Sequence, residues 1–302
     1  MRKILNTTSS RVGAGILVLF LLVAIFGPML VGNPNATNGP LNHAPTAGYL
    51  LGTTNVGQNV LTQLVVSTRD SLLVSILAAV IASALAVAVG VTGAVLGGVS
   101  DELLSLLSNV MLVIPTLPLV VVLAGYLHGS GVIVVALVIA FTGWSWSARI
   151  YRVQAMSLRR RDFVLAARAS GEGSFRIIFS EVLPHMVPLI AAQFLNVVLY
   201  AIMTQAGLAF LGLGSISQWT WGSMLYWADN AQAFQLSQWW WFVPPGLCIA
   251  LFGTALVLLN SAIDNWADSR LQSGLRMSDT KTRRGRRKPA VATTPADVEV
   301  AS

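Results

Sequence analysis

Charged side chains are scarce in this chain, and their scarcity excludes an ordinary soluble protein. Only 10% of the 302 residues are Asp, Glu, Lys or Arg, whereas soluble domains carry about 25%. Apolar residues make up 55% of the chain. Several apolar runs reach the roughly 20 residues that a helix needs to cross the hydrocarbon core of a bilayer. The composition therefore predicts an all-α integral membrane protein with several spans.

Residues for catalysis, metal binding and disulfide formation are also few. Cys248 is the only cysteine, so no intrachain disulfide can form. His43, His128 and His185 lie far apart in the sequence and show no metal-ligand spacing. No G-x-S-x-G or H-E-x-x-H motif occurs, and no lysine follows a glycine, which excludes a Walker A loop. We expect no catalytic residue, metal or cofactor in this chain, so energy for uphill transport would come from another subunit.

Six apolar segments are long enough to span a membrane, at 12–31, 71–98, 103–126, 132–150, 187–211 and 241–263. Their middles hold no Asp, Glu, Lys, Arg or His. A transporter coupled to protons usually carries such groups within the membrane. This absence disfavours the alternative class, a secondary transporter or a pore that works without ATPases.

Basic residues divide unevenly between the two sides of such a six-span chain. Three precede or begin the first segment, seven lie between Arg149 and Arg176, and eight follow the last segment, so 18 of the 19 share one side and only Arg69 lies opposite. The positive-inside rule then places both termini and the 151–186 loop in the cytoplasm, with an external loop at 33–70. This topology also explains the net charge of +7 without a nucleic-acid partner.

The domain organisation follows from these segments. Residues 1–70 form a cytoplasmic start, the first span and the external loop; 71–264 form a five-helix core; 265–302 form a basic cytoplasmic tail, which we expect to be disordered from Gln272 onward and to contact anionic lipid. The first span is longer than a secretory signal core and lacks an A-x-A cleavage site, which favours an uncleaved anchor over a signal peptide.

The stretch LAARASGEGSFRIIFSEVLPHMVP at 165–188 is too polar for a span and too apolar on one side for a linker. We expect Asp162 to cap a short helix and Gly171 to end it in a left-handed conformation. We expect Ser174 to cap a second helix that Pro184 ends, because proline lacks a backbone donor. The second helix would present one apolar face, made of Phe175, Ile178, Phe179 and Val182.

Two readings of this stretch remain open on these grounds alone. Two short helices at an angle make a rigid protrusion, whereas a basic amphipathic helix can also lie flat on a membrane surface.

The stretch resembles the cytoplasmic EAA loop of ABC importer permeases, E-A-A-x3-G-x9-I-x-L-P. Matching residues are Ala166, Ala167, Gly171, Leu183 and Pro184. Leu165 replaces the glutamate of the pattern, and Glu181 replaces the isoleucine. These two departures put the polar contact of the family's glutamate in question.

Three further segments resemble the same group in the same order. LGTTNVGQNVLTQLVVSTRDSLLVS is similar to L-G-T-D-x-x-G-R-D-V-x-S-R-L-x-x-G-x-R-x-S-L, MTQAGLAFLGLG to T-E-A-x-L-S-F-L-G-L-G with Gln205 for the glutamate, and WGSML at 221–225 to W-G-x-M-L. Together the motifs cover about residues 51–270 and point to the C-type subunit of dipeptide, oligopeptide and nickel importers.

The resemblance implies a type I ABC importer permease fold in a bacterial cytoplasmic membrane. Implied partners are a homologous B-type permease subunit, two ATP-binding subunits that hold ATP and magnesium, an external solute-binding protein and membrane lipid. The implied substrate is a short peptide, with nickel chelates or glutathione-like compounds as alternatives. The implied ATPase-coupling residues are Ala166, Ala167, Gly171, Phe175, Ile178, Phe179, Leu183 and Pro184.

Four residues are candidates for the translocation path, namely Pro115, Gln205, Gly207 and Trp221. Structural alternatives stand beside some of them, whereas the family motif places Trp221 near the external mouth. Pro115 and Pro118 kink a span whose neighbours satisfy the freed carbonyls, and Gly207 permits close helix packing. Six of the nine tryptophans lie between the last two spans, where an interfacial aromatic belt explains most of them.

Overall fold

The computed structural model describes residues 8–126, 131–213 and 216–285, and their regular structure is helical. The helices are α1 (Thr8–Leu30), α2 (Val60–Leu96), α3 (Gly98–Val113), α4 (Thr116–Tyr126), α5 (Val132–Arg159), α6 (Asp162–Ala169), α7 (Ser174–Arg176), a π-helical turn (Ile177–Val182), α8 (Leu183–Phe210), α9 (Trp221–Asn230) and α10 (Trp239–Gly285). His128 and residues 286–302 lie outside the described part of the chain.

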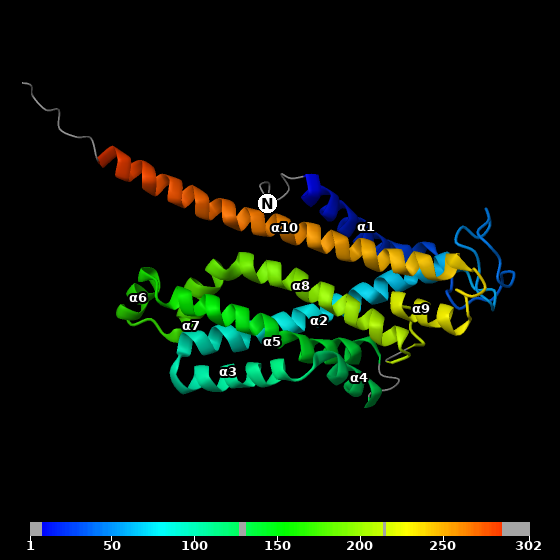
Figure 1. Ribbon diagram of the computed structural model, residues 1–302, viewed down its shortest axis with the longest axis horizontal. Coiled ribbons are helices and arrows are strands. Elements are labelled where there is room, and N and C mark those ends of the chain that lie inside the picture. The colour runs from blue at the N-terminus through cyan, green and yellow to red at the C-terminus, as the bar shows by residue number, and fades with distance from the viewer. Residues whose placement is uncertain (1–7, 127–130, 214–215, 286–302) are drawn as a thin grey trace, which may run out of the picture.

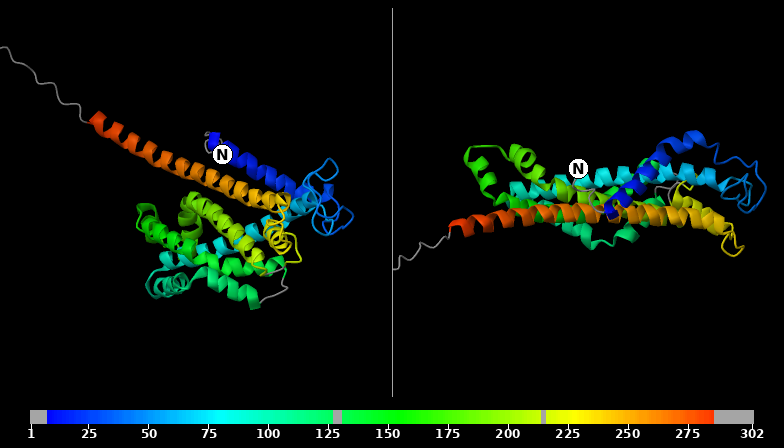
Figure 2. Two further views of the ribbon diagram at one scale, coloured as in Figure 1. Left: turned by 45° about the vertical axis from the view of Figure 1, so that its right-hand side comes forward. Right: turned by 90° about the horizontal axis from the view of Figure 1, so that it is seen from above.

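The helices form an elongated bundle around α2, which contacts α1, α5 and α8 (Figure 1). The α6–α7 segment lies at one end of the bundle, and the loop at 31–59 lies with α9 at the other (Figures 1 and 2). Small residues allow α2 to approach α5 closely: a Cβ on Gly90 would collide with the backbone carbonyl of Ala148. Close backbone approach through small residues is the usual means of packing helices in a membrane.

The number of spans agrees with the sequence. Five helices of the described chain are long and apolar enough to cross a membrane, and the α3–α4 pair makes up to six if it counts as one span. The pair is bent by 85°, so the kink expected at Pro115 is a full break. Ile114 has an extended backbone, the conformation that a residue before proline favours.

Several predicted boundaries are wrong. The second span begins at Val60 and not at 71, because the Asn59 side chain accepts hydrogen bonds from the backbone of Leu61 and Thr62 and caps the helix. The loop before it therefore ends at residue 59 and not at 70. The final helix continues to Gly285, so 272–285 is helical rather than disordered. No proline interrupts that stretch before Pro289.

Candidate functional site: the α6–α7 segment

The turn between α6 and α7 adopts the left-handed conformation that the sequence predicts at Gly171, with φ of 82°. The Gly171 amide donates to the carbonyl oxygen of Arg168 over 3.0 Å, and the Glu172 amide donates to that of Ala167 over 3.1 Å. This pair of bonds is a Schellman motif, which satisfies the last carbonyls of α6. The caps at the helix starts differ from expectation by one residue. Arg161 and Gly173 hold the cap positions, whereas Asp162 and Ser174 are the first helical residues.

Pro184 does not end the second helix, contrary to the prediction. The chain passes from α7 through the π-helical turn into α8 as one continuous helix of 37 residues, from Ser174 to Phe210. A proline in an α-helix clashes with the carbonyl four residues earlier. The turn at Ile177–Val182 is wound more widely, and the Leu183 amide donates five residues back to Ile178. Pro184 then lies in the first turn of α8, where its missing donor costs little.

The four residues expected to form one apolar face of the second helix do not share one environment: two are buried and two are exposed. Ile178 and Val182 are buried in the bundle core. Phe175 is 75% exposed and Phe179 is 60% exposed, and their rings stack with centroids 5.6 Å apart. The division follows from the helix being joined to α8, because its inner side must pack on the bundle. An exposed aromatic pair therefore remains on the outer side.

The other matching residues lie around this pair in varied surroundings. Ala166 and Pro184 are exposed, whereas Ala167 and Leu183 are half-buried. Phe163 of α6 stacks on the ring of His185 in α8, with centroids 4.6 Å apart. This contact braces the short helix against the long one.

Arg168 of α6 ties the segment to α2, and two arginines of α5 join that helix to α2 and α3. Arg168 donates from Nη2 to the carbonyl oxygen of Val95 over 2.8 Å, and Arg159 donates from Nη1 to that of Ala94 over 3.1 Å. Both carbonyls belong to the last turn of α2. Nearby, Arg152 binds both carboxylate oxygens of Asp101 at 2.7 and 2.8 Å, which joins α5 to α3. The segment is thus a rigid, basic protrusion with an exposed aromatic pair.

The four path candidates come from separate places in the bundle. Pro115 is exposed at the α3–α4 break, and Gln205 is buried in α8. Gly207 faces open space, since a Cβ there would meet nothing within 4 Å. It therefore does not serve close packing within this chain.

Trp221 is a core residue, with only 1% of its surface exposed. Its indole Nε1 donates to the hydroxyl of Thr68 over 3.2 Å, and its amide donates to the hydroxyl of Ser71 over 2.9 Å. Its ring packs edge-on against Phe20 and Phe252. Trp221 therefore joins α9 to α1, α2 and α10.

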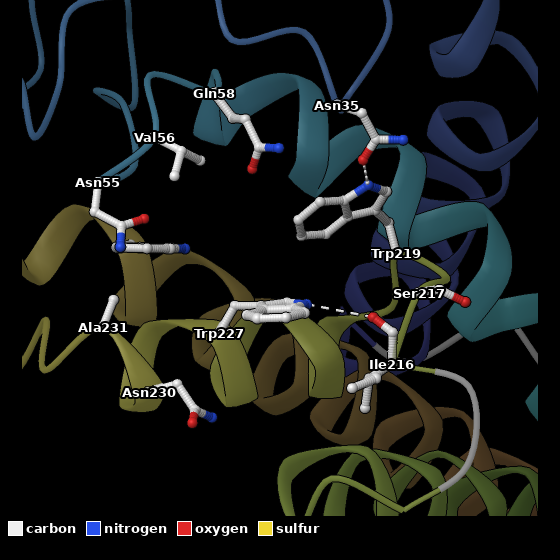
Figure 3. A pocket seen from close by; sticks show the side chains of 11 residues that line it. Asn35, Asn55, Val56, Gln58, Ile216, Ser217, Trp219, Trp227, Asn230 and Ala231 are labelled. Carbon is white, nitrogen blue, oxygen red and sulfur yellow. Dashed lines mark hydrogen bonds between the residues drawn. The ribbon is translucent and has the colours of Figure 1, made fainter. Parts of the chain in front are cut away.

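A cleft of about 620 Å³ opens between the 31–59 loop and α9 (Figure 3). Trp219 donates to the Asn35 amide oxygen over 2.8 Å, and Trp227 donates to the carbonyl oxygen of Ile216 over 3.3 Å. Trp219, Trp227 and the mostly buried Trp241 line this cleft, so these three do not form a simple belt. The sequence interpretation missed the cleft. The sequence offers only a partial signal, the dense tryptophans between 219 and 241, because the Asn-rich loop that faces them is distant in sequence.

Comparison with known proteins identifies the class. The model of the family described as the binding-protein-dependent transport system inner membrane component matches residues 82–273. The chain belongs to this family. The matched region includes the whole α6–α7 segment and runs through α8 and α9 into α10. Membership makes the chain a transport component of the membrane and is consistent with a type I ABC permease fold.

Relatives of this family cover most of the chain. The oligopeptide transport system permease protein OppC of Bacillus subtilis is 30% identical, with 85% of each chain covered. The dipeptide transport system permease protein DppC of Alkalihalophilus pseudofirmus is 31% identical, with 87% of this chain and 86% of the relative covered. A probable peptide ABC transporter permease of Sinorhizobium fredii is 32% identical, with 85% and 88% covered.

Proposed function

We propose that this chain is a transmembrane permease subunit of an ATP-driven importer for short peptides. It forms half of the translocation pathway with a homologous B-type subunit. Two ATP-binding subunits, which hold ATP and magnesium, drive it from the cytoplasm, and an external solute-binding protein delivers the peptide. The names of the relatives, which include oligopeptide and dipeptide permeases, support the peptide assignment over nickel chelates or glutathione-like compounds.

The exposed pair of Phe175 and Phe179 is the observation that carries the coupling role. Exposed apolar patches with a polar rim mark interaction sites, and this pair lies on a rigid segment among arginines. Ile178 and Val182 on the other side of the same helix are buried in the bundle. A helix lying flat on lipid would direct these two residues outward with the phenylalanines. The geometry therefore supports a protein-docking protrusion over a surface helix.

Reconstitution tests the proposal. The permease pair, the ATP-binding subunits and the binding protein are placed in liposomes, and uptake of a labelled dipeptide is measured with and without ATP. We expect ATP-dependent uptake that stops when the Walker A lysine of the ATP-binding subunits is replaced, and no ATPase activity from this chain alone. Uptake driven by a proton gradient without those subunits would favour a secondary transporter.

A further inference from the structure

A second feature of the cytoplasmic segment is a strongly basic pocket. A pocket of about 460 Å³ lies where α6 meets the end of α5, and it is lined by Met156, Arg159, Arg160, Leu165 and Arg168. Arginine stays protonated at any physiological pH. Three of the five lining residues are therefore positive, and none is acidic.

Two of these arginines are held in place without being neutralised. Their hydrogen bonds to the carbonyls of Ala94 and Val95 engage dipoles rather than full negative charges. A helix C-terminus favours nearby cations, which explains their position at the end of α2. A Cβ on Gly97 would collide with the Arg159 guanidinium, so this side chain is closely packed. The guanidinium groups are thus oriented in advance of any partner.

The nearby carboxylates leave two of the pocket arginines without an ion pair. Asp101 pairs with Arg152 at 2.7 Å and also interacts with the charge of Arg159. Glu172 pairs with Arg176 at 3.6 Å, so neither carboxylate forms an ion pair with Arg160 or Arg168. The Nε of Arg168 is buried and has no hydrogen-bond partner within the described chain. Buried charges in proteins are normally paired. Within the described chain the pocket therefore has two arginines without an ion pair, Arg160 and Arg168, and an unused donor on Arg168.

Leu165 explains why no acidic residue lines the pocket. The family pattern has glutamate at this position, and a glutamate here would place a carboxylate beside the three arginines from within the chain. Leu165 is 51% exposed at the pocket. It directly precedes the exposed Ala166, which is one of the coupling residues that the family resemblance implies.

We propose that this pocket binds an aspartate or glutamate side chain of the ATP-binding subunit. The inference rests on the proposed function and adds the chemistry of one contact to it. The guanidinium group of arginine can bind a carboxylate through two parallel, charge-assisted hydrogen bonds. The Met156 and Leu165 side chains exclude water beside the pair. The acidic group that the permease lacks at residue 165 is supplied by its partner.

Binding measurements on the whole permease pair test this contact. The pair is placed in nanodiscs of zwitterionic lipid, labelled ATP-binding subunits are titrated, and the Kd is measured at several salt concentrations. Arg160→Gln and Arg168→Gln should each raise the Kd about tenfold and flatten its salt dependence, because a charge pair is lost. Arg160 is not anchored on α2, so its substitution avoids disturbing that helix. Arg161→Gln is the matched control, since Arg161 is exposed, adjacent and outside the pocket; its Kd should change less than about twofold.

Leu165→Glu gives a test of opposite sign. A carboxylate supplied by this chain should neutralise the pocket and raise the Kd about tenfold. Leu165→Gln removes the apolar side chain without adding charge, so it should raise the Kd clearly less than Leu165→Glu does. Tighter binding by Leu165→Glu, or an unchanged Kd in the two arginine variants, would overturn the proposal. Effects that appear only when anionic lipid is added would instead assign the pocket to a lipid phosphate.

Failure of this inference is separable from failure of the proposed function. If wild-type permease does not bind the ATP-binding subunits, the proposed function fails. If it binds them and Phe175→Ser weakens binding while the arginine variants do not, only the pocket assignment fails.

Discussion

Phe175 and Phe179 stack one turn apart on the outer side of the helix that begins at Ser174, with ring centroids 5.6 Å apart and both rings mostly exposed. Two aromatic side chains that are mostly exposed contribute little to the packing of the bundle. Aromatic anchors that enter pockets dominate the energy of many interfaces.

Phe175→Ser should therefore weaken binding of the ATP-binding subunits by about tenfold or more, since truncating an interface anchor costs 2 kcal/mol or above. The permease itself should remain folded. Phe234→Ser is the control, because Phe234 is 79% exposed and lies in the turn after α9, at the other end of the bundle (Figure 1). Equal effects of the two changes on the Kd, measured by titration in nanodiscs, would remove the docking role from the pair.

Gly171→Val should stop the α6–α7 segment from transmitting movement between the permease and the ATP-binding subunits, while the membrane-spanning helices stay intact. A Cβ at Gly171 would meet nothing within 4 Å, so the cost is the backbone conformation alone, with φ of 82°. That cost is about 1–2 kcal/mol for an L-residue. We expect normal insertion and assembly but loss of most ATPase stimulation by loaded binding protein.

Gly173→Val is the matched control for this change. Gly173 also faces open space, but its φ is −71°, which any L-residue adopts. Near wild-type stimulation in the Gly171 variant would show that the turn does not transmit the ATPase movement.

Gly90→Leu should destabilise the bundle itself. Because even a Cβ at this position would collide with the Ala148 carbonyl, α2 and α5 would have to separate. Overpacking of this kind costs about 1–3 kcal/mol. Thermal unfolding of the purified permease pair should show a lower midpoint, whereas Gly246→Leu, at a glycine with open space in α10, should not.

Topology can be tested by cysteine labelling. With Cys248 replaced by alanine, a cysteine at Ser174 should react only from the cytoplasm and one at Thr46 only from outside. Both residues are exposed, and the distribution of basic residues sets the direction. Reaction of both from the same face would contradict the orientation.

Local signals in the sequence predicted some features well because their physical cause is local. The left-handed turn at Gly171 is confirmed, since only the residue type and the helix end are involved. The break at Pro115 follows from the same kind of cause. The prediction that Pro184 ends a helix is wrong because the helix continues through a wider π-helical turn just before the proline. No residue type in the sequence specifies such a turn.

Features that depend on packing could not be predicted. The inward direction of Ile178 and the outward direction of Phe175 follow from where the bundle lies, and an amphipathic pattern does not give that. The Trp219 and Trp227 cleft needs the 31–59 loop to fold against α9, a contact between residues distant in sequence. The anchoring of Arg168 on Val95 is likewise a long-range contact.

The continuity of α7, the π-helical turn and α8 makes a single rod of 37 residues. At 1.5 Å per residue the rod is about 55 Å long, which exceeds the roughly 30 Å hydrocarbon core. It begins beside Phe175 and ends at Phe210, near the start of the connection to α9. A rod pivoting in the membrane moves its two ends in opposite directions. Displacement of the α7 tip would therefore reach the α9 end as a reversed displacement, reduced by any bending at the π-helical turn or at Pro188 within α8.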